Sequence, residues 1–128
     1  MKKRVTGLGG FFFKSNQPKE LKEWYGKHLG LPVDEYGATF WWKDKEGNEA
    51  STQWSVFDRD TTYLEPSKKE FMMNFRVENL TELMSILKAE GVQQVGTIKE
   101  YSYGKFGWIM DPDGNKIELW EPIDEELK

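Results

Sequence analysis

The sequence predicts an α+β fold in which one small unit, a strand, a helix and a hairpin, occurs twice. The first observation is a turn signal, Asp-x-x-Gly-Asn, that appears at 44–48 and again at 111–115. Asp opens a turn through its side-chain oxygen, and Gly-Asn tolerates the positive φ of a chain reversal. The second is that aromatic and β-branched residues flank both turns, as in paired strands. The third is a strand-then-helix pattern before each hairpin, so we expect the functional site between the two copies.

The first copy begins with the aromatic run 11–13, which we interpret as a strand. The basic N-terminus leads into this run through three glycines, a pattern that does not resemble a signal peptide. A helix should follow, with Pro18 near its start and Gly30 at its end. The hairpin strands are predicted around 39–42 and 51–57.

The second copy has a strand at 73–77 and then a single apolar stripe at helical spacing. Asn79, with Glu82 three residues later, is typical of a capping box, and Gly91 suits a left-handed helix end. The hairpin strands are predicted around 106–110 and 117–120. This copy is a few residues longer than the first, and the extra residues fall around 96–105.

Composition agrees with one domain over 1–128, divided into module one at about 4–64 and module two at about 70–122. The absence of cysteine excludes disulfides, thiolate metal sites and a cysteine nucleophile. A net charge of −4 without a basic stripe argues against a nucleic-acid partner. No apolar run approaches the ~20 residues of a membrane-spanning helix, so we expect no membrane partner and a cytoplasmic protein.

The pattern resembles the vicinal oxygen chelate superfamily, which includes glyoxalase I, bleomycin-resistance proteins, methylmalonyl-CoA epimerase and extradiol dioxygenases. The resemblance covers nearly the whole chain and is most specific at its end. The segments that carry it are Trp24-Tyr25, Leu29-Gly30-Leu31, Asn74-Phe75-Arg76-Val77, Tyr103-Gly104 and 111–122. It implies two βαβββ modules whose mixed sheet curls around a cup, usually completed by a homodimer.

The resemblance also implies four positions for the ligands of a divalent metal. Glu118 matches the last of these, whereas Gly10, Met72 and Ser51 occupy the others. Gln53, on the same strand face as Ser51, is at most a weak ligand. We therefore expect no cofactor, and a divalent metal is possible but disfavoured. The single histidine, His28, falls outside these positions and is interpreted as a solvent-facing residue near a helix end.

Glu118 and the aromatic residues are the candidate site. Glu118 could act as a general acid or base beside aromatic surface, or could simply pair with a lysine such as Lys116 or Lys105. Aromatic residues make up 15% of the chain. Most should be core, but some would line the cup. The ligand-binding candidates are Gln53, Trp42, Tyr101, Tyr103 and Trp120.

Two functions follow from these residues. The first is a small-molecule-binding protein, similar to the bleomycin-resistance branch, that holds an aromatic or amphipathic ligand without a complete metal site. The second is a lyase, isomerase or dioxygenase-type enzyme that uses Glu118 as metal ligand or general base. Whether the protein is an enzyme is left open by the sequence.

Overall fold

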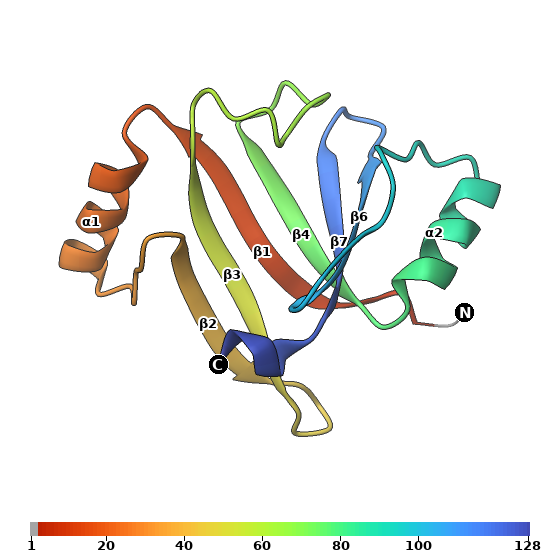
Figure 1. The fold of residues 1–128 in the computed structure, drawn as a ribbon, viewed down its shortest axis with the longest axis horizontal. Helices are drawn as coiled ribbons and strands as arrows, with labels where there is room; N and C mark the ends of the chain where they lie inside the picture. Colours follow the sequence, from red (N-terminus) through yellow and green to blue (C-terminus); the bar gives the residue numbers. More distant parts are fainter. Residues whose placement is uncertain (1–2) are drawn as a thin grey trace.

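The computed structural model describes residues 3–128, and its main feature is one seven-stranded mixed sheet with a helix at each end (Figure 1). The elements are β1 (Val5–Ser15), α1 (Pro18–Leu29), β2 (Gly37–Lys43), β3 (Glu49–Asp58), β4 (Phe71–Val77), α2 (Leu80–Ala89), β5 (Lys99–Tyr101), β6 (Gly104–Met110), β7 (Lys116–Pro122) and the 3-10 helix η1 (Asp124–Leu127). This confirms the α+β fold.

The strand order, β2-β3-β1-β4-β7-β6-β5, shows the internal duplication. β1 and β4, the first strands of the two modules, pair antiparallel at the centre. Each has a parallel partner from its own module, β3 for β1 and β7 for β4, and the outer hairpins are antiparallel. The two modules therefore join edge to edge in one continuous sheet.

The modules differ in one strand. Module two is a complete βαβββ unit, and β5 lies in the longer segment that the sequence comparison placed at 96–105. In module one the segment between α1 and β2 forms only an isolated bridge, from Val33 to Ala38 of β2.

The predicted turns and helix ends are confirmed. Each hairpin tip has an aspartate, Asp44 or Asp111, whose Oδ1 accepts hydrogen bonds from two backbone N–H groups further along the turn. Gly30 ends α1 with a φ of 72°. The side chain of Asn79 accepts from the backbone N–H of Glu82 at the start of α2. Short-range hydrogen bonds therefore set these ends, as the local sequence indicated.

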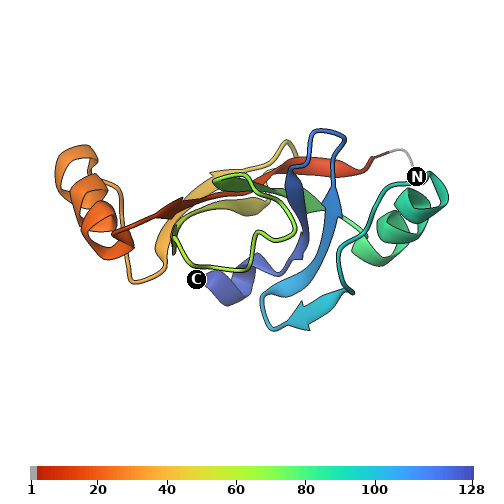
Figure 2. The same ribbon diagram turned by 90° about the horizontal axis from the view of Figure 1, so that it is seen from above.

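The sheet curls, and several segments lie on the same side of its central strands. Figure 2 shows the connection 59–70, the β5–β6 hairpin and η1 on this side. The hydrophobic core there consists of Phe12, Leu64, Met72, Phe106, Trp108 and Trp120. A second core packs α2 on the other side through Val77, Leu80, Leu83, Met84 and Leu119.

Within residues 3–128, the structure contains no helix with the length and hydropathy needed to cross a membrane.

Candidate functional site

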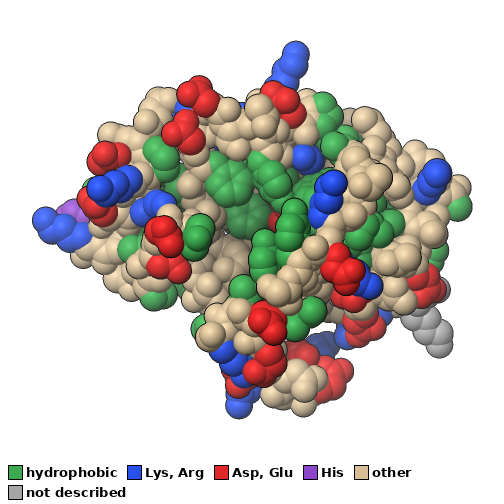
Figure 3. Space-filling model, viewed as in Figure 1, with side chains coloured by type: hydrophobic (Ala, Val, Ile, Leu, Met, Phe, Trp, Pro, Cys, Tyr) green, Lys and Arg blue, Asp and Glu red, His purple; other side chains and the backbone are tan. Residues whose placement is uncertain are grey.

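The concave side of the sheet contains a cavity of about 770 Å³, which we call the cup. It is bounded by the strands of both modules, by the connection 59–70 and by η1. Figure 3 shows hydrophobic side chains gathered in the hollow of this face. Nine aromatic residues line the cup: Phe12, Tyr36, Trp54, Phe57, Tyr63, Tyr101, Tyr103, Phe106 and Trp120. Such a cavity is of the size and character of small-molecule sites in general.

A row of four residues crosses the central strands at the cup floor. Gly10 pairs with Gln53 in one module, and Asn74 pairs with Glu118 in the other. Gly10 also pairs with Asn74 across the module boundary. The row therefore contains one residue from each of the four central strands, β3, β1, β4 and β7.

The register also places the other two positions that the resemblance assigned. Ser51 lies on β3 two residues nearer the first hairpin tip than Gln53. Met72 lies on β4 two residues before Asn74, in the hydrophobic core. Strand register depends on pairing across the sheet, which an alignment of the two turn signals does not include.

Glu118 is buried on this floor, with only 3% of its surface exposed. Its Oε1 accepts from Nδ2 of Asn74 at 2.6 Å. Its Oε2 accepts from Nε1 of Trp108 at 2.9 Å and from the hydroxyl of Tyr63. All three donors are neutral, so within residues 3–128 the carboxylate is oriented without a contacting cation.

The suggested ion pair between Glu118 and Lys116 does not form. No Lys116 or Lys105 nitrogen lies within ion-pair distance of Glu118 in the described chain. Nζ of Lys116 donates instead to the backbone oxygen of Tyr63 at 2.6 Å and lies over the Tyr63 and Trp108 rings. Burial lowers the pKa of Lys116, although the negative charge of Glu118 opposes that shift.

Tyr63 is held as a hydrogen-bond donor. Burial, and then the charge of Glu118 beside it, raise the pKa of its phenol far above the usual range. Tyr103, nearer the cup rim, also has a raised pKa, because of burial and then the electrostatic influence of Tyr101 and Glu118. Both hydroxyls are therefore protonated at neutral pH and can donate.

A second series of side-chain hydrogen bonds begins at Gln53 and runs away from the cup. Oε1 of Gln53 accepts from the Thr39 hydroxyl at 2.9 Å, and its Nε2 donates to the Ser51 hydroxyl at 3.2 Å. The Ser51 hydroxyl in turn donates to Oδ1 of Asp124 at 2.9 Å. The polar atoms of Gln53 are thus both engaged by protein groups.

This series of hydrogen bonds ends at a buried ion pair between Arg76 and Asp124, which holds η1 at the base of the cup. Arg76 donates through Nη1 to the Ser51 carbonyl at 3.0 Å and to Asp124 Oδ1 at 2.9 Å. Its Nη2 donates to Oδ2 of Asp124 at 2.6 Å. Burial opposes ionisation of Asp124, but the hydrogen bonds from Arg76 and Ser51 outweigh it and lower the pKa of the carboxyl. The guanidinium is also flanked by the Trp42 and Trp120 rings.

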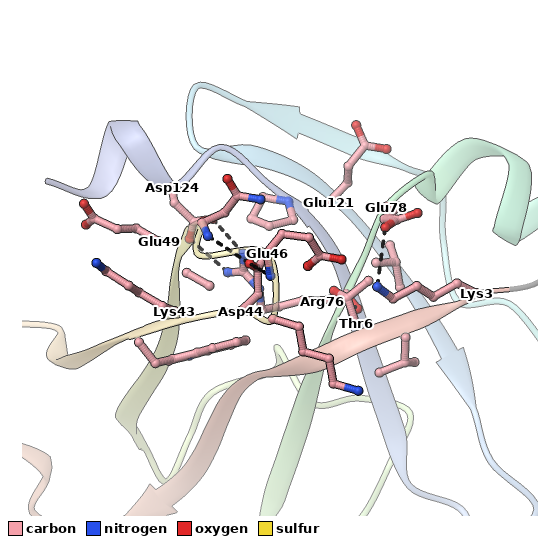
Figure 4. A pocket seen from close by; sticks show the side chains of 17 residues that line it. Lys3, Thr6, Lys43, Asp44, Glu46, Glu49, Arg76, Glu78, Glu121 and Asp124 are labelled. Atoms are coloured by element: carbon pink, nitrogen blue, oxygen red, sulfur yellow. Dashed lines mark hydrogen bonds and ion pairs between the residues drawn. The ribbon is translucent and has the colours of Figure 1, made fainter.

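Arg76 and Asp124 also border a second hollow of about 760 Å³, shown in Figure 4. It lies at the other end of the sheet, between the β2–β3 hairpin, the start of β1 and the ends of β4 and β7. Trp42 lies here and is not among the residues that line the cup. The structure therefore separates Trp42 from the other predicted ligand-binding residues, while Gln53, Tyr101, Tyr103, Trp120 and Glu118 line one cavity.

Three residues around Glu118 were missed by sequence reasoning. Tyr63 is in an irregular connection, where no periodicity indicates which side chains point inward. Trp108 was recognised only as a strand residue, and its indole donor gave no signal of a partner. Asn74 did give a signal, because it is a polar residue in an apolar strand; it is 1% exposed in the fold.

The floor residues do not fit a divalent metal ion. Gly10 offers no side-chain donor, and Gln53 turns its oxygen to Thr39. Asn74 presents its amide nitrogen, not its oxygen, to Glu118, whose own oxygens accept from protein donors. No three His, Cys, Asp or Glu side chains gather as a ligand set in the part of the chain that the structure describes. His28 lies on α1 against the Trp24 ring, outside the cup.

Comparison with known proteins agrees with this architecture. Residues 10–120 match the family described as "Glyoxalase-like domain". No curated protein sequence matches the chain significantly.

Three solved structures show the same fold. A methylmalonyl-CoA epimerase from Mycobacterium tuberculosis has a TM-score of 0.68 and 22% identity, over 99% of this chain and 95% of that one. A Streptomyces coelicolor methylmalonyl-CoA epimerase variant in complex with 2-nitronate-propionyl-CoA has 0.70 and 13%, over 93% and 99%. A Legionella pneumophila chain, described as an NAD-dependent benzaldehyde dehydrogenase, has 0.57 and 14%, over 88% and 97%.

The family match covers most of the chain, and the solved structures reproduce its two joined modules. The chain therefore belongs to the glyoxalase-like domain family of the vicinal oxygen chelate superfamily.

Proposed function

We propose that this protein binds a flat, largely apolar small molecule in the cup and does so without a metal ion. The observation that carries the proposal is the combination of aromatic walls with a floor carboxylate that accepts from three neutral protein donors. Most of the ligand's binding free energy would come from removing aromatic surface from water. Polar groups at the floor and at the Tyr101–Tyr103 rim would then fix its orientation.

The hydrogen bonds of Glu118 argue against a role as general base. A base needs a lone pair directed at the proton it removes. Here Oε2 accepts from both an indole N–H and a phenol, and Oε1 accepts from an amide. An indole nitrogen can only donate, so this contact cannot reverse when a substrate arrives.

The binding test uses N-phenyl-1-naphthylamine, a flat neutral probe whose fluorescence rises in apolar surroundings. We expect saturable binding at one site per chain. Tyr101→Ala should weaken it about tenfold, because stacking on an exposed ring contributes roughly 1 kcal/mol beyond the buried area. Trp24→Ala, which also removes an exposed aromatic ring but lies on α1 outside the cup lining, is the matched control. Absence of saturable binding would overturn the proposal.

The metal test is a calorimetric titration of chelator-treated protein with Mn²⁺, Co²⁺, Ni²⁺ and Zn²⁺. We expect no stoichiometric binding, because the floor offers a single carboxylate that is engaged by protein donors. One tightly bound equivalent that Glu118→Gln abolishes would contradict the metal-free part of the proposal.

An enzyme of the lyase, isomerase or dioxygenase type is the second candidate. It is favoured by the position of Glu118 on the cavity floor and by the fold shared with methylmalonyl-CoA epimerases. The direct test is incubation with methylmalonyl-CoA in D₂O, with and without Co²⁺, while exchange at the acidic carbon is followed by NMR. Exchange that Glu118→Gln abolishes would favour this candidate, and absence of exchange would remove the epimerase reaction from consideration.

A homodimer in the cytoplasm completes the proposal. Large apolar side chains remain exposed on the central and edge strands, among them Leu8 and Phe11 of β1 and Phe40 and Trp41 of β2. Exposed apolar surface of this kind is typical of an interface with another chain.

A further inference from the structure

We propose that the cup selects an organic cation, with a flat aromatic body and a positively charged nitrogen directed at the floor. This inference rests on the proposed binding function and specifies its ligand class. Three features of the cup carry it: the sign of its charged residues, the burial of Glu118 without a contacting cation, and the aromatic walls.

The charged residues that line the cup in the described chain all have the same sign. Asp34, Glu118 and Glu126 line it, and no lysine, arginine or histidine appears among the described residues that do so. The chain has 18 lysines and arginines in all, so this exclusion is not a shortage of basic residues. A cavity lined by one sign of charge within low-dielectric walls attracts a ligand of the opposite sign.

Within residues 3–128, no cationic side chain contacts the buried Glu118. Its hydrogen-bond partners are neutral. The ammonium of Lys116 is directed to the Tyr63 carbonyl, and the guanidinium of Arg76 is matched by Asp124. A buried carboxylate without a paired charge is unfavourable, because hydrogen bonds replace only part of its hydration. A cation entering the cup would restore that balance.

The floor contains one further source of negative potential. Oδ1 of Asn74, buried beside Glu118, has no hydrogen-bond partner in the described structure. Its carbonyl dipole adds to the carboxylate charge on the same floor. A neutral apolar ligand would leave both groups without compensation, whereas a cation interacts favourably with each.

The walls suit a cation as well as a flat body. The Tyr101 and Tyr103 rings stack at 5.4 Å with an interplanar angle of 7°, and both meet the Phe106 ring edge to face. Aromatic faces carry negative electrostatic potential, and rings that surround a cavity are the usual receptor for ammonium groups that cannot be neutralised. An anionic ligand would face both these rings and three carboxylates.

The test compares three flat probes at pH 8: N-methylquinolinium, which is always cationic, quinoline, which is neutral at this pH, and naphthalene-1-sulfonate. Each displaces N-phenyl-1-naphthylamine from the protein. We expect the cation to bind about tenfold more tightly than quinoline, and the sulfonate to bind more weakly than either. Raising the salt concentration should weaken the cation alone.

Substitutions test whether the selectivity for the cation depends on Glu118. Glu118→Gln should weaken N-methylquinolinium about tenfold and change quinoline less than about threefold, because it removes the charge and keeps the shape. Glu23→Gln removes the same charge from the exposed surface of α1, outside the cup, and should change neither. If Glu118→Gln does not fold, Glu126→Gln at the rim replaces it, with an expected loss of about two- to threefold for the cation only.

The possible results distinguish failure of the cation selectivity from failure of the proposed small-molecule binding. Equal affinities for quinoline and N-methylquinolinium, or equal weakening of both by the Glu118 and Glu126 variants, would overturn the cation selectivity and leave apolar binding intact. Failure of all three probes and of the naphthylamine itself would overturn both.

Discussion

Replacing Asp124 with asparagine tests whether the buried ion pair holds η1 against the base of the cup. Asp124→Asn keeps the shape of the side chain but leaves the Arg76 guanidinium without its counter-charge. That guanidinium has 8% of its side-chain surface exposed, against 15% for Asp124, so solvent cannot replace the lost partner. The change should therefore destabilise the whole domain.

The magnitude follows from what remains after the substitution. Removing one partner of a buried ion pair costs about 3–5 kcal/mol, because the other charge stays buried. Asparagine can still accept from Ser51, and Asp124 is partly exposed, so we expect about 3 kcal/mol. For a chain of this length that corresponds to a fall in Tm of roughly 10 °C.

The assay is urea unfolding at pH 7, with thermal unfolding as a second readout. Glu125→Gln is the matched control, because Glu125 is the next residue of η1 and its solvent-exposed pair with Lys128 should contribute little to stability. A free energy of unfolding for Asp124→Asn within about 0.5 kcal/mol of the unmodified protein would refute the reasoning, since that is the range of neutral surface changes.

The same pair predicts a pH dependence. The pKa of Asp124 is lower in the folded chain than in the unfolded chain, where it is about 3.9. Such a carboxyl stabilises the fold above its unfolded pKa, and that contribution is lost as the pH falls through the folded pKa. The difference in the free energy of unfolding between the unmodified protein and Asp124→Asn should therefore be largest near pH 7 and shrink below about pH 4. Urea unfolding measured across this pH range checks this.

Three further predictions concern other parts of the fold. Gly9→Ala would place a Cβ 2.1 Å from Oδ1 of Asn74, so it should cost about 2–3 kcal/mol in urea unfolding and weaken probe binding by displacing the donor of Glu118; unchanged stability would contradict this. Asn79→Ala should cost about 1 kcal/mol by removing the cap of α2, again in urea unfolding, and an effect below about 0.3 kcal/mol would show that the cap is dispensable. Light scattering should give the mass of a dimer, and a monomeric mass at working concentration would contradict the proposed self-association.

The sequence alone determined those features that depend on neighbouring residues. The two hairpin tips, the helix ends at Gly30 and Asn79, and the duplication of the unit could all be predicted, because short-range hydrogen bonds and backbone preferences set them. Glu118 and Gln53 could also be placed near one site, since strand alternation and the family pattern both point there.

Only the tertiary structure decided how these pieces meet. The register across β3, β1, β4 and β7 put Gln53, Gly10, Asn74 and Glu118 in one row at the cup floor. The connection 59–70 places the hydroxyl of Tyr63 against Glu118, and Trp42 lies in a different hollow from the other predicted ligand-binding residues. The physical reason is that register and loop placement depend on pairing and packing between residues distant in sequence, which no local pattern encodes.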